Sequence, residues 1–508
     1  MSHETELKLA LHANDLPRLL ALPLLAAQTP RREHLRNTYF DTASLALMQQ
    51  RLAVRERRVG RRTLLTVKTA GHSVGGLSQR GEWEGPTKPG RFDFATLVDD
   101  ATLAQQLTQL APQLVPVFRT DFTRLSWLLT HAGAQVEVAL DQGFIATDGV
   151  QGARREPLLE LELELKSGPV DALLDLALTL ALGPNGEAAQ GLWLHPTDRS
   201  KAERGLALFL GQAPGPVKTQ IPALTADQSP RMAFRTVALA SLVHLQANVS
   251  GWLHAASHPG LVPDPEFVHQ ARVALRRLRT ALQLFGPALP RRFVAHWRRQ
   301  WRATAHALAD AREWDVLVTE SLPRLRADSP GSGSDEALNH WLQTQRQAAH
   351  LRAQAALTAP AHALNVLAFT RALLALQDRK RHPPAGGRWA QRAQRPLRKT
   401  LRRKARRVHG RSAARRHALR LALKKYRQAQ ELLAGLTPPS PGHRSTAPLA
   451  RGLALLGSLN DLSVAQRLLT ACPLPGTAEL LERVQQALDT ELLALPRLKR
   501  QLLRKRAP

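Results

Sequence analysis

Residues 159–166 read Leu159-Glu160-Leu161-Glu162-Leu163-Glu164-Leu165-Lys166, a regular alternation of leucine with charged residues. In a β-strand, residues two apart share a face, so this segment places its charges on one side and its leucines on the other. Solvent-facing strands of antiparallel sheets often alternate in this way. Three glutamates in a row on such a face would, however, repel one another with no compensating gain. The pattern therefore favours a strand whose charged face lines an enclosed space.

Other segments of the N-terminal part repeat this arrangement with different signs of charge. The groups that share a strand face are Glu4, Glu6 and Lys8; Arg55 and Arg57; Thr66 and Lys68; and Arg80, Glu82 and Glu84. A closed sheet of about eight strands encloses a space wide enough for a small ligand. Carboxylates favour Mg²⁺ or Mn²⁺, and Arg and Lys bind phosphate oxygens. We therefore expect an N-terminal antiparallel barrel that performs metal-assisted hydrolysis of a phosphoanhydride.

The order of these motifs resembles the CYTH, or triphosphate tunnel metalloenzyme, superfamily over roughly the first 205 residues. The matching segments are Glu4-Thr5-Glu6-Leu7-Lys8, Tyr39-Phe40-Asp41-Thr42, Arg55 and Arg57, Lys68, Arg80-Gly81-Glu82, Arg124, Glu137 to Gly143, Glu160 to Lys166, and Ser200-Lys201-Ala202-Glu203-Arg204-Gly205. No Walker loop, which would indicate an ordinary nucleotide-binding fold, is present in the sequence.

This resemblance implies an eight-stranded antiparallel tunnel that binds triphosphate and divalent metal ions. It assigns metal binding to Glu4, Glu6, Asp141, Glu160, Glu162 and Glu164. It assigns phosphate binding and catalysis to Lys8, Arg55, Arg57, Lys68, Arg80, Glu82, Arg124 and Lys201. Which of the three closing glutamates contacts metal stays open. We expect Asp41 and Thr42 to stabilise a turn instead.

Charge divides the chain into two parts. The sequence carries a formal net charge of +30, from 71 Lys and Arg against 41 Asp and Glu. Residues 1–210 hold 23 basic and 24 acidic residues, which leaves 48 basic and 17 acidic residues for the remainder. The positive electrostatic field of this remainder implies a polyanionic partner, such as nucleic acid, polyphosphate or an anionic membrane surface.

The sequence has no apolar run near the ~20 residues of a membrane helix, and its one cysteine excludes an internal disulfide.

The C-terminal part contains an internal repeat. Residues 269–279 read H-x-x-R-x-x-L-R-R-x-R, and residues 417–427, 148 positions later, read H-x-x-R-x-x-L-K-K-x-R. The surrounding sequence has helical periodicity, so we expect two related helical bundles. This half resembles a CHAD domain, which implies a basic groove that binds inorganic polyphosphate. The residues assigned to that groove are His269, Arg272, Arg276, Arg277, Arg279, His417, Arg420, Lys424, Lys425 and Arg427.

The expected fold is thus an α+β multidomain protein, similar to bacterial CYTH–CHAD inorganic triphosphatases. The expected limits are 1–210 for the tunnel, 211–224 for a linker and 225–508 for the helical domain, with repeats at about 225–370 and 380–508.

The expected function is hydrolysis of inorganic triphosphate to pyrophosphate and phosphate with Mg²⁺ or Mn²⁺, together with binding of inorganic polyphosphate. Two alternatives remain open: a polyphosphate-binding protein without catalysis, and an adenylate cyclase-type tunnel enzyme. We expect a cytoplasmic protein, associated with polyphosphate granules, that does not insert into membranes. Sequence-specific nucleic-acid binding is not expected, because aromatic residues make up only 5% of the chain.

Overall fold

The structure is a computed structural model of the chain. It describes residues 3–69, 71–148, 152–183, 186, 191–218, 222–257, 263–327, 336–378, 386–410, 412–436, 447–474 and 477–503. The chain forms two compact units. Unit 1 comprises residues 1–216, 246–263 and 358–375, and unit 2 comprises residues 217–245, 264–357 and 376–508. The limits expected from the sequence follow the chain continuously, whereas these units do not.

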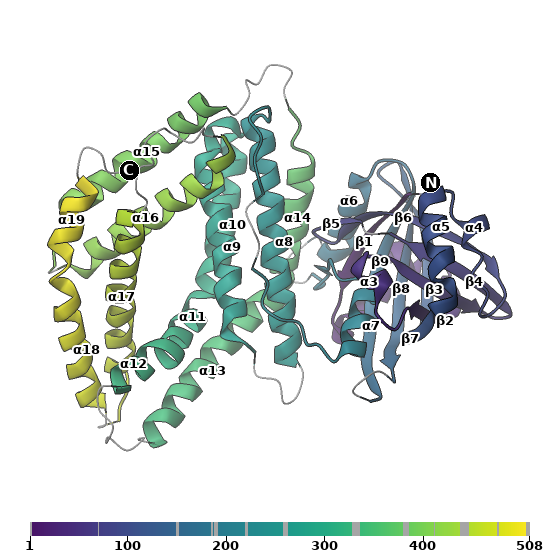
Figure 1. Cartoon of the computed structure of the whole chain (residues 1–508), viewed down its shortest axis with the longest axis horizontal. Helices are drawn as coiled ribbons and strands as arrows, with labels where there is room; N and C mark the ends of the chain where they lie inside the picture. The colour runs from purple at the N-terminus through teal and green to yellow at the C-terminus, as the bar shows by residue number, and fades with distance from the viewer. Residues whose placement is uncertain are drawn as a thin grey trace. The chain divides into compact units, whose positions relative to one another are not determined.

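Eight strands of unit 1 close into the predicted antiparallel barrel (Figure 1). Around the barrel they follow the order β1 (His3–Ala10), β9 (Arg154–Ser167), β8 (Ala134–Thr147), β7 (Val115–His131), β2 (Arg31–Asp41), β3 (Ala53–Val59), β4 (Arg62–Lys68) and β6 (Leu77–Thr87). Pairing of β6 with β1 closes the ring. Two short strands, β5 (His72–Val74) and β10 (His195–Pro196), add to β6 and β1.

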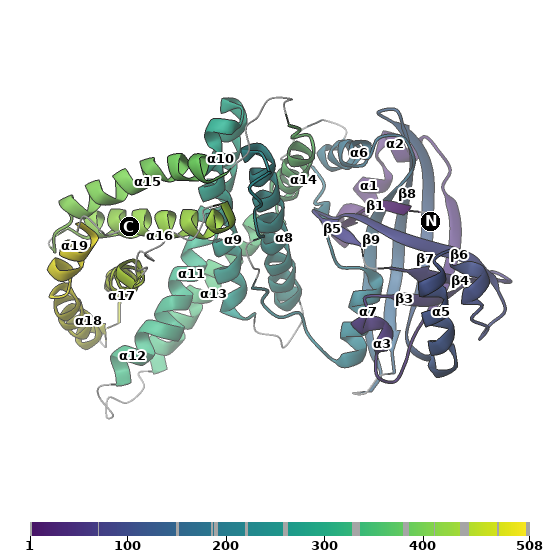
Figure 2. The same ribbon diagram turned by 45° about the horizontal axis from the view of Figure 1, so that its top comes forward.

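The apolar faces of the strands point outward and are covered by helices. Leu161 and Leu163 of β9 are fully buried, in a core that also contains residues of helix α6 (Asp171–Leu182). On another side, α4 (Phe94–Leu97) and α5 (Ala101–Leu110) cover a second core that includes β4 (Figure 2). This burial of alternate residues explains why β9 carries its glutamates on the inner face and its leucines on the outer face.

Helix α7 (Lys201–Leu210) packs against the barrel and begins at a capping box. Ser200 accepts a hydrogen bond from the backbone of Glu203, whose side chain accepts one from the Ser200 backbone. This cap fixes the start of the helix, so that Lys201 lines the barrel cavity. Gly205, one turn later, lies against the ring of Phe118, and a Cβ there would overlap that ring.

The turn predicted at Asp41 and Thr42 is present. The carboxylate of Asp41 accepts hydrogen bonds from the backbone of Thr42, Leu47 and Met48, at 2.7, 2.8 and 3.0 Å. It thereby caps the short helix α3 (Ala46–Gln49).

The C-terminal part of the chain is helical, as predicted. Its helices are α8 (Pro230–Ser257), α9 (Pro265–Leu284), α10 (Arg291–Ala307), α11 (Ala309–Val316), α12 (Leu322–Ala327), α13 (Glu336–Thr358), α14 (Pro360–Leu374), α15 (Gly387–Arg407), α16 (Ala413–Leu432), α17 (Ala447–Thr470), α18 (Thr477–Leu492) and α19 (Leu495–Leu503). α14 belongs to unit 1, where Arg371 pairs with Asp175 of α6 at 2.8 Å. No helix in the described ranges has the length and hydropathy needed to cross a membrane.

The internal repeat is visible in unit 2. α9 and α16 carry the two copies of the motif. They begin at residues 265 and 413 and end at residues 284 and 432, so both ends keep the offset of 148 positions. The side chains of Thr280 and Gln428, which occupy equivalent positions of the two copies, hydrogen-bond to each other at 2.7 Å. The two repeats therefore meet along these helices.

Candidate functional site

The barrel encloses a cavity of about 980 Å³ lined by charged residues. Its wall carries ten carboxylates and eleven Lys and Arg side chains. All eight residues predicted to bind phosphate or to catalyse line it: Lys8, Arg55, Arg57, Lys68, Arg80, Glu82, Arg124 and Lys201. Of the six predicted metal ligands, four line it: Glu4, Glu6, Glu162 and Glu164. The other two, Asp141 and Glu160, lie behind the wall and are 0% and 2% exposed.

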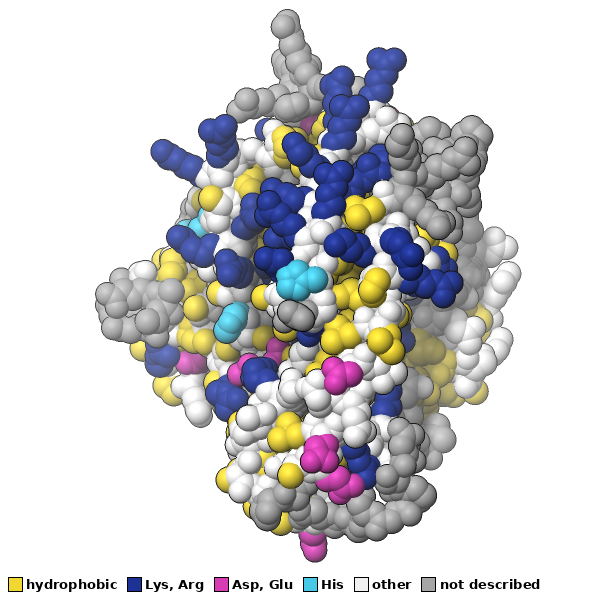
Figure 3. Space-filling model, turned by 90° about the vertical axis from the view of Figure 1, so that its left-hand side faces the viewer, with side chains coloured by type: hydrophobic (Ala, Val, Ile, Leu, Met, Phe, Trp, Pro, Cys, Tyr) yellow, Lys and Arg dark blue, Asp and Glu magenta, His cyan; other side chains and the backbone are white. Residues whose placement is uncertain are grey.

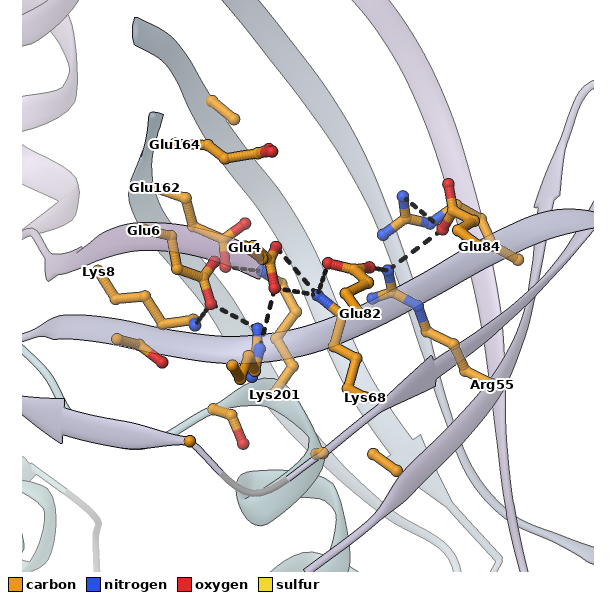
Figure 4. A pocket seen from close by; sticks show the side chains of 18 of the residues that line it. Glu4, Glu6, Lys8, Arg55, Lys68, Glu82, Glu84, Glu162, Glu164 and Lys201 are labelled. Atoms are coloured by element: carbon orange, nitrogen blue, oxygen red, sulfur yellow. Dashed lines mark hydrogen bonds and ion pairs between the residues drawn. The ribbon is translucent and has the colours of Figure 1, made fainter. Parts of the chain in front are cut away.

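On one side of the cavity, the carboxylates of β1 pair with cations of β1, β4 and β6 (Figure 4). Glu4 accepts hydrogen bonds from Lys68 of β4 and from Arg80 of β6, both at 2.9 Å. Glu6 pairs with Lys8 and with Arg80. Burial of Glu4 would raise its pKa, but Lys68 and Arg80 hold the pKa well below its usual range. Glu4 is therefore an anion over the whole working pH range.

The pKa of Glu82 of β6 is shifted in the opposite direction from the pKa of Glu4. Its carboxylate lies 3.0 Å from Lys68 and 3.6 Å from Arg55. Burial raises the pKa of Glu82, and the hydrogen bond that it shares with Glu4 adds to this increase, although Lys68 opposes it. Glu82 thus takes up a proton more readily than Glu4 and Glu84, whose pKa values are lowered.

Beside this cluster, three carboxylates of β8 and β9 hold Lys201 and Arg124. Arg124 of β7 donates to both oxygens of Asp141, at 2.6 and 2.7 Å, and to Glu162 at 2.6 Å. The ammonium of Lys201 lies 2.7 Å from Asp141 and 3.0 Å from Glu162, and it also pairs with Glu160. These three carboxylates converge closely enough to hold a metal ion, but in this structure the Lys201 nitrogen occupies their focus. Asp141 and Glu160 therefore position the two cations.

A row of acidic residues runs across three neighbouring strands at the cavity wall. Glu164 of β9 lies opposite Glu6 of β1 on one side and Glu137 of β8 on the other. Lys166 lies 2.8 Å from Glu164 and 3.2 Å from Glu137. Burial raises the pKa of Glu164, as do Glu4 and Glu137, although Lys166 opposes them. Directly opposed like charges destabilise a sheet, and clustered oxygens are the ligands that Mg²⁺ and Mn²⁺ prefer, so the row fits a divalent cation.

Nine charged cavity residues were not assigned from the sequence, among them Glu84, Glu137 and Lys166. Glu84 lies 3.6 Å from both Arg55 and Arg57, and Glu137 and Lys166 belong to the acidic row. Strand periodicity already placed Glu84 on the face of Glu82. Glu137 stood in one of the segments that carried the resemblance, but its place opposite Glu164 depends on the register of β8 against β9, which no local pattern reveals.

Unit 2 contains a second charged cavity, of about 810 Å³, between α9, α10, α11, α16 and α17. Its lining holds ten Lys and Arg side chains against two carboxylates. Eight of the ten residues predicted to bind polyphosphate line it: His269, Arg272, Arg276, Arg279, His417, Arg420, Lys424 and Lys425. Arg277 is buried on α9 away from this lining, and Arg427 pairs with Glu431 at 2.8 Å. Three arginines of α10 that the motif does not contain, Arg298, Arg299 and Arg302, complete the wall.

Cations in this pocket repel one another. In the described ranges, neither Arg276 nor Lys424 has a carboxylate within ion-pair distance, and Arg420 has only Asp461, at 3.9 Å. Burial lowers the pKa of Lys424 to about 7, and Arg420 and Arg276 contribute to this decrease. Burial and neighbouring arginines likewise lower the pKa of Arg276. A bound polyanion would relieve this repulsion.

Comparison with known proteins identifies one domain family for each half of the chain. A CYTH domain matches residues 2–185, and a CHAD domain matches residues 236–470. The chain is a CYTH domain followed by a CHAD domain. An inorganic triphosphatase from Haemophilus influenzae is 34% identical over 221 residues, which cover 41% of this chain and 55% of that protein. The chain thus matches about half the length of this relative.

Among solved structures, the CHAD domain from the plant Ricinus communis is 29% identical, with a TM-score of 0.42, and covers 57% of this chain and 93% of that one. A putative adenylyl cyclase from Hippeastrum, described as having a dominant triphosphatase activity, is 19% identical, with a TM-score of 0.28, and covers 41% of this chain and 96% of that one.

Proposed function

We propose that the CYTH barrel hydrolyses inorganic triphosphate to pyrophosphate and phosphate with divalent metal ions. The observation that carries this proposal is the near balance of charge in its cavity, with ten carboxylates against eleven Lys and Arg. A site that only bound polyanions would gain nothing from these carboxylates, because they repel phosphate. Triphosphate carries several negative charges, so it would enter a balanced cavity favourably only together with cations.

Four carboxylates at the cavity surface, Glu4, Glu6, Glu162 and Glu164, would hold Mg²⁺ or Mn²⁺. When bound, such an ion neutralises charge on phosphate oxygens and lowers the pKa of a bound water. Asp141 and Glu160 act from behind the wall, where they hold Lys201 in place.

The basic residues of the wall bind and orient the substrate. Guanidinium groups bind phosphate oxygens in a bidentate manner, so Arg55, Arg57, Arg80 and Arg124 would hold the chain of phosphates, assisted by Lys8, Lys68 and Lys201. The same cations stabilise the charge that builds on the leaving pyrophosphate. Glu82, with its raised pKa, would accept a proton from the attacking water at its carboxylate. The name of the Haemophilus relative, inorganic triphosphatase, supports the proposed reaction.

Phosphate release from triphosphate, pyrophosphate, ATP and long-chain polyphosphate, with Mg²⁺, Mn²⁺ or EDTA, tests the proposal. We expect triphosphate to be turned over and EDTA to stop the reaction. Tight binding of long polyphosphate without any turnover would make the protein a binding protein instead. Formation of a cyclic nucleotide and pyrophosphate from ATP would make it a cyclase.

We also propose that the pocket of unit 2 binds inorganic polyphosphate, which would associate the protein with polyphosphate granules. The unpaired, mutually repelling cations Arg276 and Lys424 support this second function. The variant Arg276→Glu with Lys424→Glu should lose polyphosphate binding while triphosphate turnover continues. Unchanged binding by this variant would remove the pocket from the proposal.

A further inference from the structure

Helix α15 presents a straight row of cations to solvent. Six of its seven exposed Lys and Arg residues recur every three or four positions, which is one helical turn, so these six fall on one stripe of the helix surface. The row comprises Arg388, Arg392, Arg395, Lys399, Arg403 and Arg406. At 1.5 Å per residue, it is about 27 Å long.

The opposite face of α15 anchors the helix in unit 2. Ala390, Leu397, Leu401 and Ala405 are buried there. Because the apolar face of the helix is already packed inside the protein, a lipid surface would meet only charges on the exposed face. An amphipathic helix that enters a membrane needs the reverse arrangement.

The row is not explained by contacts within the protein. In the described ranges, none of its six side chains has a carboxylate within ion-pair distance. Cations three or four positions apart on a helix repel each other, so the row opposes helix formation. Figure 3 shows Lys and Arg side chains gathered over the upper part of the face that it displays, with few carboxylates among them. A feature that costs stability and satisfies no internal partner suggests a ligand.

The internal repeat provides a comparison with the same helix of the other copy. At the offset of 148, the first five positions of the row correspond to Ala240, His244, Ala247, Gly251 and Ala255 of α8, none of which is Lys or Arg.

The core-facing positions, by contrast, remain apolar in both copies. Ala390 and Leu397 of α15 correspond to Leu242 and Val249 of α8, and all four are buried. The apolar face is therefore common to both copies, whereas the row of cations belongs to α15 alone; the corresponding positions of α8 are buried or half-buried.

We propose that the α15 row binds the sugar–phosphate backbone of a nucleic acid, independently of sequence. Its cations follow one another at about one per 5.4 Å helical turn. This spacing suits phosphates that are separated by a sugar better than the phosphates of inorganic polyphosphate, which are separated by a single bridging oxygen. The row contains no aromatic side chain on which bases could stack, so it would contact only the backbone. None of its residues lines the charged pocket of unit 2, so the row is a different surface from that pocket.

Fluorescence anisotropy with a labelled single-stranded DNA of mixed sequence, measured on the full chain over a range of salt concentrations, tests this proposal. Replacing all six cations with Gln should weaken binding roughly 100-fold or more near 50 mM salt. The slope of log K against log salt should lose about 4, or 0.7 for each phosphate no longer contacted. The triple variant Arg388→Gln, Arg395→Gln, Arg403→Gln should reduce the slope by about 2, half of the reduction expected for the sixfold variant. It replaces the sixfold variant in this test if the latter does not fold.

The matched control removes the same charge from the barrel surface by changing six other exposed cations to Gln: Arg32, Arg36, Arg58, Arg61, Lys88 and Arg91. We expect this control and the Arg276→Glu, Lys424→Glu variant to retain the slope of the unaltered protein. Equal losses in the α15 variant and the barrel control would overturn the proposal, because net charge alone would then account for binding. It would also be overturned if the α15 variant kept its affinity for DNA but lost its affinity for long-chain polyphosphate or for anionic phospholipid vesicles.

Discussion

Asp141→Asn tests whether a buried carboxylate positions the cations of the barrel cavity. Asp141 is fully buried and accepts from Arg124 at 2.6 and 2.7 Å and from Lys201 at 2.7 Å. Asn has nearly the same shape, but it removes the charge and turns an amide NH₂ toward these donors. Removing one partner of a buried ion pair costs about 3–5 kcal/mol. Arg124 keeps Glu162 and Lys201 keeps Glu160, so we expect the lower value, about 3 kcal/mol.

Hydrogen–deuterium exchange of peptides from β7 and β8 measures this loss locally. A cost of about 3 kcal/mol corresponds to exchange on the order of 100-fold faster. The matched control is Asp148→Asn, because Asp148 also pairs with an arginine of β7, Arg119, at 3.2 Å. Both of these side chains are more than half exposed, so the control should cost no more than about 0.5 kcal/mol. If the two variants exchanged at the same rate, Asp141 would not have the positioning role assigned to it.

Three further predictions concern packing and pH. Gly205→Ala should destabilise unit 1 by about 1–3 kcal/mol in urea unfolding, because the added Cβ would overlap Phe118. The control Gly457→Ala lies in open space on α17 and should stabilise unit 2 by up to about 1 kcal/mol. Equal effects of the two variants would refute the packing argument. The pKa of Lys424 is lowered to about 7, so between pH 7 and 10.5 the unfolded chain binds a proton that the folded chain does not. The stability of unit 2 should therefore rise with pH over this range. Its affinity for polyphosphate should fall over the same range, because Lys424 loses its charge. Lys424→Arg should flatten both profiles in calorimetric titrations, and an unchanged pH dependence would count against this origin. Burial lowers the pKa of His195 from 6.5 to about 3, so the stability of unit 1 should be lost as pH falls through that window, and His195→Phe should reduce the loss measured by acid unfolding.

The barrel could be predicted because the alternation in β1, β3, β6 and β9 assigns each residue to a face. The same pattern could not separate Glu162, at the cavity surface, from Glu160, which is buried behind it. Periodicity gives the direction of a side chain but not its depth, which depends on the tilt of the strands and on where α7 inserts Lys201.

The helical half shows a similar limit. The repeat at an offset of 148 predicted the equivalence of α9 and α16, and the pairing of Thr280 with Gln428 agrees with it. The sequence motif did not include the arginines of α10 that complete the pocket, because their approach to α9 depends on helix packing rather than on local pattern. Nor did it indicate that α14 belongs with the barrel unit.

The most direct test of the central claim is the rate of phosphate release from triphosphate with Mn²⁺, compared between the unaltered chain, Glu6→Ala, and Arg276→Glu with Lys424→Glu. We predict that Glu6→Ala abolishes turnover while polyphosphate binding remains, and that the double variant turns over triphosphate at the unaltered rate. Undiminished turnover by folded Glu6→Ala, or loss of both functions from either folded variant, would contradict a metal-dependent site in the barrel that is separate from the pocket of unit 2.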